Sequence, residues 1–331
     1  MSPSWVIFIP LILFLLALLL LGRTDPQRTG ADFLKSYFLG DRALKGFVLA
    51  MTLVATYGSV SSFVSGPGLA WQYGLGWVVF AAPQIITGFL VLGVLGKKLS
   101  LVSRKIGAIT VIDVIVARFK SPALGAFLSI TLLFFFMAMM VGQFIGGAQL
   151  ISQAAGIDYV LGLLIFGVVV IAYTTTGGFK AVAITDTVCA LLMLVGMGVL
   201  AADIIGQAGG LSSLMQKINQ EANAGQAQAF FTPTSSGALP WTLLFSSWIL
   251  VGFATVALPQ SAVRCMAYRR TEDLHLAMVV STAVCGALMI GMTLLGFLAR
   301  GVIPDAEVFG NNTDAMIPYL ISHYMNPWGR R

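Results

Sequence analysis

Long apolar runs separated by short polar segments form the main pattern along this chain. A helix needs about 20 mainly apolar residues to cross a bilayer. Lipid cannot satisfy exposed backbone groups, so helices are the expected form of such runs. The pattern therefore predicts an all-α polytopic membrane protein. Candidate spans are 5–22, 46–72, 75–97, 122–151, 158–176, 181–206, 239–258 and 274–303.

Two of these spans contain residues that interrupt a helix. Residues 55–68, ATYGSVSSFVSGPG, include Pro67, which lacks an amide hydrogen and disfavours helical geometry at Gly66. Residues 246–260, SSWILVGFATVALPQ, carry glycine and threonine before a closing proline. Transporters bind ions and substrates at such discontinuous helices. The alternative is a glycine-packed, kinked helix whose serines bond back to its own backbone.

The interrupted helices are the second and seventh spans, five apart. Corresponding breaks at this spacing suggest two inverted five-helix repeats with a site between them. We expect an extra N-terminal helix and loop over 1–45, a first repeat over 46–206 and a loop with a short helix over 207–238. Residues 239–331 then hold two helices of the second repeat and a tail.

Composition and charge support a membrane protein and orient it. Apolar residues make up 58% of the 331, the mean hydropathy is +0.91, and charged residues are only 10%, against about 25% in soluble proteins. The basic residues lie in short loops, so the pI of 9.3 does not indicate nucleic-acid binding. Basic residues concentrate on the cytoplasmic side. An external N-terminus leaves only these basic residues outside: Lys217, Arg300, Arg330 and Arg331.

Other classes of protein have little support. The first span has no basic residue before it and no A-x-A site after it, unlike a cleaved signal peptide. The cysteines form no CxxC pair and the histidines lie far apart, so neither a disulfide framework nor a metal cluster is indicated. No nucleophile–base pair or phosphate loop appears, so we do not expect an enzyme. Residues 107–119 are predicted to form a short helix at the cytoplasmic face.

Polar residues inside the spans are the candidate functional groups. Asp186, near the cytoplasmic start of the sixth span, is a functional candidate because buried carboxylates are costly; its alternative is pairing with Lys180 or a loop. Gln84 and Gln143 lie mid-span and either bind a solute or bond between helices. Trp248 either lines a cavity or packs. Arg264 is expected to cap a helix or contact lipid, and Asp203 is expected to be interfacial.

One segment resembles a family signature. The fifth span ends in YTTTGGFKA and continues to TD. It is similar to the signature of the sodium:solute symporter family, in which an apolar helix ends before Gly-Gly-Phe. Further matching stretches run from about 37 to 305, most closely to members that carry pantothenate: YFLGDR, LAMTLVATY, SSF, GPG, YGLGW, LGKK, QFIGGAQL, AAGI, GLLIFG, LP before SAVRC, and VIPD.

The resemblance implies a leucine-transporter-type inverted-repeat fold with an extra N-terminal helix. It implies sodium-coupled uptake of pantothenate, or a similar small organic anion, across the bacterial cytoplasmic membrane. Sodium would be held by the backbone carbonyls of Ala55 and Gly58, with Asp186 on the ion pathway. Substrate-site positions of the family match Ser59, Ser62, Gln84 and Thr255.

The chain departs from the family in three respects. Cys189 stands where many members have glutamine, and Tyr57 stands where some relatives have an acidic residue. The chain ends where the next core helix would begin, which leaves the second repeat incomplete and omits hydroxyls of the sodium site. The alternatives are a symporter for proline, a sugar or a monocarboxylate, a solute sensor, and a truncated remnant without function. Besides the lipid bilayer, we expect no nucleic acid and no obligate protein partner.

Overall fold

The computed structural model describes residues 30–221, 227–309 and 312–324, together with a few positions between 9 and 20. Within this part of the chain, helices and turns account for the structure, and the only sheet-like pairing is an isolated bridge between Leu44 and Tyr268. The predicted all-α class is confirmed. The predicted span 5–22 lies largely outside the described residues.

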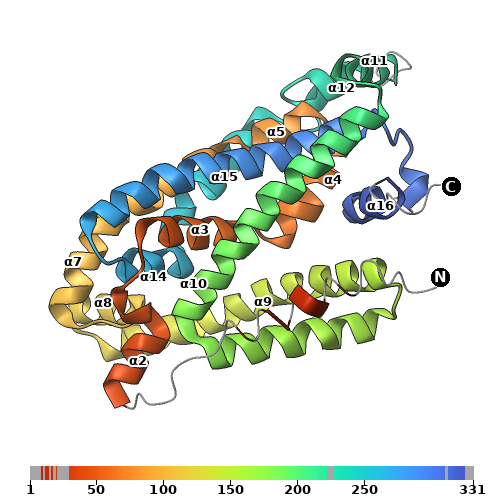
Figure 1. Cartoon of the computed structure of the whole chain (residues 1–331). Coiled ribbons are helices and arrows are strands. Elements are labelled where there is room, and N and C mark those ends of the chain that lie inside the picture. Colours follow the sequence, from red (N-terminus) through yellow and green to blue (C-terminus); the bar gives the residue numbers. More distant parts are fainter. Residues whose placement is uncertain are drawn as a thin grey trace. The chain divides into compact units, whose positions relative to one another are not determined.

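The remaining predicted spans correspond to helices of membrane-crossing length (Figure 1). Four helices meet that requirement alone, and two interrupted pairs raise the number in the described residues to six. These six cover seven predicted spans, because one long helix contains both 158–176 and 181–206. The single helices are Leu75–Ile106, Pro122–Ser152, Tyr159–Gln207 and Thr271–Ala299, and the pairs are Gly46–Tyr57 with Ser61–Tyr73 and Trp241–Ala257 with Pro259–Ala267.

Short turns of 3-10 or π geometry divide several spans into shorter α-helices. The α-helices of the first half are α2 Gly30–Leu39, α3 Gly46–Tyr57, α4 Gly66–Tyr73, α5 Leu75–Ala81, α6 Thr87–Leu90, α7 Lys97–Ile106, α8 Val111–Phe119 and α9 Pro122–Ala155. Those of the second half are α10 Tyr159–Gln207, α11 Leu211–Glu221, α12 Ala227–Phe231, α13 Trp241–Ser247, α14 Pro259–Ala267, α15 Thr271–Ala299 and α16 Met316–His323.

The chain groups into two compact units. Unit 1 comprises 1–56, 88–190 and 255–281. Unit 2 comprises 57–87, 191–254 and 282–331. Every boundary falls inside an apolar span or at its break rather than in a polar loop, so the units are groups of packed segments, not successive domains. The predicted repeats stay a prediction.

In unit 1, one carboxylate ties the start of α3 to the start of α15. The Asp273 carboxylate accepts the backbone N–H of Gly46 at 2.8 Å and that of Arg270 at 3.2 Å. The first N–H groups of a helix have no partner within it. Asp273 therefore caps α3 from a segment more than 200 residues away in sequence.

A break at Gly178 divides α10 into the two predicted spans. Gly178 has φ 59° and ψ −175°, a backbone conformation open essentially only to glycine. Just before it, the Tyr37 hydroxyl of α2 donates to the carbonyls of Thr174 and Thr175, at 3.2 and 3.3 Å. The GG of the YTTTGGFKA segment thus ends one helix and begins the next.

The predicted helix at 107–119 is confirmed as α8. Thr110 and Asp113 form a reciprocal capping box at its start. Nearby, the Arg42 guanidinium donates to the carbonyls of Ser103 and Ala108. Burial, and then the charge of Arg104, lower the pKa of Arg42 below its usual value.

Unit 2 has an apolar core around α4, the end of α10, α11, α15 and α16. Trp71 belongs to this core and donates its indole N–H to the Ile303 carbonyl at 2.8 Å. The Arg300 guanidinium lies 4.1 Å from the centre of the Trp71 ring and 4.6 Å from that of Phe230. Only a tail was predicted after residue 303, so α16 is a helix that the sequence did not predict.

Candidate functional site

The first interrupted helix opens at Gly58 and Ser59, where α3 ends. The Ser59 N–H donates to the Tyr57 carbonyl, and the Ser62 N–H donates to the Ser59 carbonyl. In a continuous α-helix these two donors would bond to the carbonyls of Ala55 and Gly58. The carbonyls of Ala55 and Gly58, which are predicted to bind sodium, therefore do not accept the N–H groups that would bond to them in a continuous helix.

The opening is not at Gly66 and Pro67, where the sequence analysis expected helical geometry to fail. Gly66 keeps helical angles of φ −59° and ψ −52°. A π-turn over Ser61–Ser65 precedes it, and the Gly66 N–H donates to the Ser61 carbonyl. Pro67 then occupies the first turn of α4, where proline is common.

A cavity of about 250 Å³ lies in unit 2 beside this opened turn. Its polar wall comes from the serines of the broken helix, from Gln84 and from Thr293 of α15. Its apolar wall includes Trp77 and Phe80, whose rings stack with centroids 4.2 Å apart. Among the described residues, no charged side chain lines it. The lining residues are Tyr57, Ser59, Ser61, Ser62, Ser65, Gly66, Leu69, Trp77, Phe80, Ala81, Gln84, Val251, Met289 and Thr293.

Internal hydrogen bonds use some of the hydroxyl hydrogens in this cavity. Ser62 donates to the Tyr57 carbonyl at 3.1 Å, and Thr293 donates to the Met289 carbonyl at 2.9 Å. Ser59 and Ser61 share one hydrogen bond of 2.6 Å. Two hydroxyls that share one bond keep one hydrogen for another acceptor. The Ser59–Ser61 pair can therefore donate to a solute.

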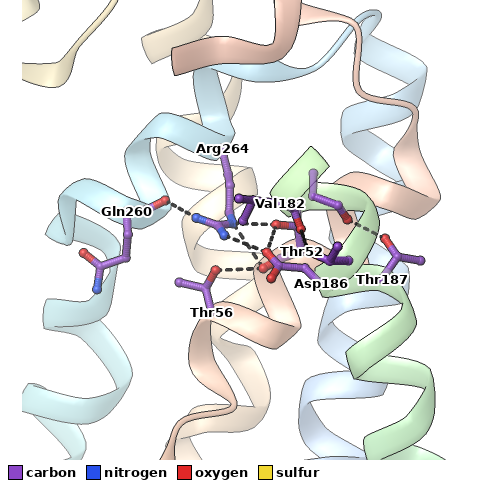
Figure 2. Close-up of polar contacts among 9 residues, drawn as sticks. Thr52, Thr56, Val182, Asp186, Thr187, Gln260 and Arg264 are labelled. Carbon is purple, nitrogen blue, oxygen red and sulfur yellow. Dashed lines mark hydrogen bonds and ion pairs between the residues drawn. The ribbon is translucent and has the colours of Figure 1, made fainter. Parts of the chain in front are cut away.

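In unit 1, Asp186 is the centre of a network of polar contacts (Figure 2). Its Oδ2 accepts the Thr52 hydroxyl at 2.5 Å and the Arg264 guanidinium at 3.2 Å. The Arg264 Nε donates to the Thr52 carbonyl at 3.1 Å, and its NH1 donates to the Gln260 carbonyl at 2.9 Å. The side chains of Asp186 and Arg264 are 20% and 9% exposed. An arginine thus compensates this carboxylate inside an apolar span.

The contacts of Arg264 differ from the role expected for this residue, and they identify the ion-pair partner of Asp186. It is buried and bound to Asp186, rather than capping a helix end or contacting lipid. Among the described residues, the ion pair of Asp186 is with Arg264 and not with Lys180, the partner that the sequence suggested. Distance in sequence concealed this pair.

The other predicted site residues are more scattered. Trp248 donates its indole N–H to the Val79 carbonyl at 2.9 Å and is not part of the cavity wall. Gln143, on α9, and Thr255, in a 3-10 turn, belong to unit 1, and their substrate contacts stay predictions. Asp203 accepts the Gln207 amide at 2.9 Å.

Several residues of these sites were not singled out from the sequence. Thr52 and Thr293 read as single polar residues within apolar helices, which is common and uninformative. Trp77 and Phe80 are three residues apart, the spacing that puts two side chains on one helix face. That spacing was the available signal for the aromatic wall.

Comparison with known proteins identifies the class. The model of the sodium:solute symporter family matches residues 37–330. The chain is 43% identical over 279 residues to the sodium/pantothenate symporter of Escherichia coli strain K12, covering 84% of this chain and 57% of that protein. It is 42% identical over 302 residues to the sodium/pantothenate symporter of Haemophilus influenzae strain Rd, covering 91% and 60%.

More distant similarity extends to other solutes and to a solved structure. A sodium/proline symporter of Staphylococcus aureus is 29% identical over 199 residues, covering 59% of this chain and 39% of that protein. A substrate-bound, outward-open structure of a Na⁺-coupled sialic acid symporter superposes with a TM-score of 0.77 at 20% identity, covering 97% of this chain and 67% of that one.

The fold of that structure confirms the leucine-transporter type expected from the resemblance. This chain spans about 57–60% of the length of the two pantothenate symporters. The matched family consists of membrane symporters rather than enzymes, and the apolar helices agree with a multi-pass membrane protein. The chain belongs to the sodium:solute symporter family.

Proposed function

We propose that the protein imports pantothenate across the cytoplasmic membrane together with sodium. The observation that carries this proposal is the hydroxyl-lined cavity at the opened turn of a spanning helix. Backbone opened at membrane depth is tolerated where it lines a cavity or binds an ion. The choice of pantothenate as the substrate is based on the two pantothenate symporters that share 42–43% identity with this chain.

Sodium would bind at the carbonyls of Ala55 and Gly58. The N–H groups that would bond to these carbonyls in a continuous helix bond instead to the carbonyls of Tyr57 and Ser59. A small hard cation prefers oxygen ligands. Sodium there would hold the opened turn in one geometry and lower the ordering cost of binding substrate. Binding of the two ligands is then coupled by the same factor in both directions. Asp186 would lie on the path by which sodium leaves.

Pantothenate would present its carboxylate to neutral donors. The described residues of the cavity wall carry no charged side chain, so hydroxyl and amide hydrogens would satisfy the carboxylate. The spare hydrogen of the Ser59–Ser61 pair and the amide of Gln84 are suitable donors. The stacked Trp77 and Phe80 rings would pack against the aliphatic part of the substrate.

We further propose an external N-terminus and two inverted repeats, the first over 46–206 and the second beginning at 239. The charge distribution supports the orientation. The correspondence of the breaks at Gly58 and at Leu258 supports the repeats. Cysteine accessibility from each side of sealed vesicles tests the orientation directly.

Ser59→Ala is expected to raise the KM for pantothenate by about tenfold, because a hydrogen bond to a charged group contributes about 1.5–3 kcal/mol. Ser246→Ala is the matched control. The Ser246 hydroxyl donates to the Thr242 carbonyl one turn back, and Ser246 lies on α13 and does not line the cavity. Equal effects of the two substitutions on KM would place the substrate elsewhere.

Uptake of labelled pantothenate tests the function itself. Cells without their own carrier would express either this chain or a version extended with the further helices of its relatives, with and without a sodium gradient. Sodium-dependent uptake is expected in the extended version. Uptake by the 331-residue chain alone would mean that its helices suffice and that the sodium site needs no further ligands.

Competition in the same cells separates the alternative substrates. Unlabelled pantothenate should displace the label, whereas proline, sugars and monocarboxylates should not. Uptake blocked by proline but not by pantothenate would replace the proposed substrate with the solute named for the Staphylococcus aureus relative.

A further inference from the structure

The contact between Arg264 and Asp186 is suited to opening. The NH2–Oδ2 distance of 3.2 Å exceeds the 2.7–2.9 Å usual for a charge-assisted hydrogen bond. A single guanidinium nitrogen reaches a single carboxylate oxygen, so the paired geometry that gives arginine–carboxylate contacts their strength is missing.

Arg264 keeps other partners if this contact opens. Its Nε donates to the carbonyl of Thr52 and its NH1 to the carbonyl of Gln260, both on neutral main chain. The guanidinium also lies 5.7 Å from the centre of the Phe179 ring. The guanidinium is therefore held in place by groups that carry no charge, and Asp186 is only one of its contacts.

Asp186 likewise keeps a partner. The Thr52 hydroxyl donates to Oδ2 at 2.5 Å, and a second hydroxyl, that of Thr56, donates to the Thr52 carbonyl at 2.7 Å. Both hydrogen bonds to the carboxylate fall on Oδ2, so within the described residues Oδ1 accepts none. Figure 2 shows the carboxylate together with its two partners, Thr52 and Arg264. Removal of the arginine contact leaves a carboxylate that is still oriented.

We infer that Arg264 is a tethered cation that competes with sodium for Asp186. The inference rests on the proposed function, in which sodium passes Asp186. Two cations beside one partly buried carboxylate repel each other more strongly than they would in water, because the dielectric constant is lower there. Sodium therefore weakens the Arg264 contact, and Arg264 lowers the affinity for sodium by the same factor. Arg264 makes sodium leave Asp186 instead of remaining there.

A native thiol can report on this exchange. Cys189 lies one helical turn after Asp186 and is half-buried, whereas Cys265 and Cys285 are buried. The purified 331-residue chain in lipid vesicles would be alkylated with a small maleimide, with sodium replacing potassium at constant ionic strength. The alkylation rate at Cys189 is measured at each sodium concentration. The sodium concentration that produces half of the maximal change in this rate is the half-effective concentration.

Arg264→Gln is expected to lower that half-effective concentration by about tenfold, a coupling of about 1.4 kcal/mol. Arg264→Lys keeps a positive charge beside Asp186 and should stay within about threefold of the wild type. An unchanged value in Arg264→Gln would overturn the inference alone. Asp186→Asn should remove the sodium effect. If sodium does not change the alkylation rate at Cys189 in the wild type, the proposed role of Asp186 and the inference are both overturned. The same holds if sodium still changes that rate in Asp186→Asn.

A second measurement needs no variant that might misfold. Phenylglyoxal modifies arginine, and peptide mapping by mass spectrometry resolves each site. Sodium should raise the modification rate of Arg264 at least about threefold relative to potassium, because the guanidinium loses a partner. Arg42 is the internal control, since its guanidinium bonds to Ser103 and Ala108 rather than to a carboxylate of the ion path. Equal sodium effects at both arginines would overturn the inference.

Discussion

Gly296→Ala is expected to abolish measurable pantothenate binding. Gly296 lies on α15 against Pro67, and a Cβ atom there would overlap the Pro67 carbonyl oxygen and the two main-chain carbons beside it. Main chain cannot rotate away as a side chain does, so α15 and the broken helix would have to separate. Small residues at helix contacts in membranes allow such close approach.

Separation of α15 from the broken helix would change the shape of the cavity, because both helices line it. Gly66 and Leu69 line it from the broken helix, and Met289 and Thr293 line it from α15. Overpacking costs about 1–3 kcal/mol in stability, and displacement of two walls would also misplace the donors. Equilibrium binding of labelled pantothenate and the melting temperature of the detergent-solubilised protein would measure both effects.

Gly291→Ala is the matched control on the same helix. A Cβ at Gly291 would meet only the flexible end of Met197, which can move aside. This variant should retain binding within about threefold. Wild-type binding by Gly296→Ala would contradict the close contact between α15 and Pro67.

Gly178→Ala should destabilise the protein by several degrees in melting temperature and reduce the sodium effect at Asp186. The backbone at Gly178, with φ 59° and ψ −175°, costs other residues about 1–3 kcal/mol. A Cβ would also stand 3.1–3.2 Å from the ring and carbonyl of Tyr37. Asp186 follows eight residues later on the same helix, so any shift of the break moves it.

Gly196→Ala, further along α10, has no heavy atom within 4 Å of the added Cβ and should melt within about a degree of the wild type. Tyr37→Phe removes only the hydroxyl that bonds to Thr174 and Thr175, and it should cost about 1 kcal/mol. If Gly178→Ala melts like Gly196→Ala, the break does not depend on glycine.

Sequence alone predicted the spans and the presence of a broken helix, because apolar length and clustered glycine, serine and proline are local signals. The break lies at Gly58, within the predicted stretch 55–68. The loss of helical geometry expected at Gly66 does not occur, because a π-turn over Ser61–Ser65 precedes that residue. Proline marks a region of low helix stability, and tertiary packing decides at which turn the helical hydrogen bonds are lost.

The candidate site was predicted in part for the same reason. Ser59, Ser62 and Gln84 line one cavity, and the substrate contacts that the family resemblance implies for them stay predictions. Arg264 was misjudged because its partner Asp186 lies 78 residues earlier, and no periodicity links positions so far apart. The capping of α3 by Asp273, across 227 residues, was equally inaccessible to local patterns.

The ion pair of Asp186 also constrains how the chain is made. A ribosome adds about 5–20 residues per second, so Arg264 follows Asp186 by roughly 4 to 16 seconds of synthesis. During that interval the carboxylate is in or near the membrane without its arginine, and Thr52 is the partner already made. A nascent chain that stops before residue 264 would keep an uncompensated carboxylate in an apolar helix.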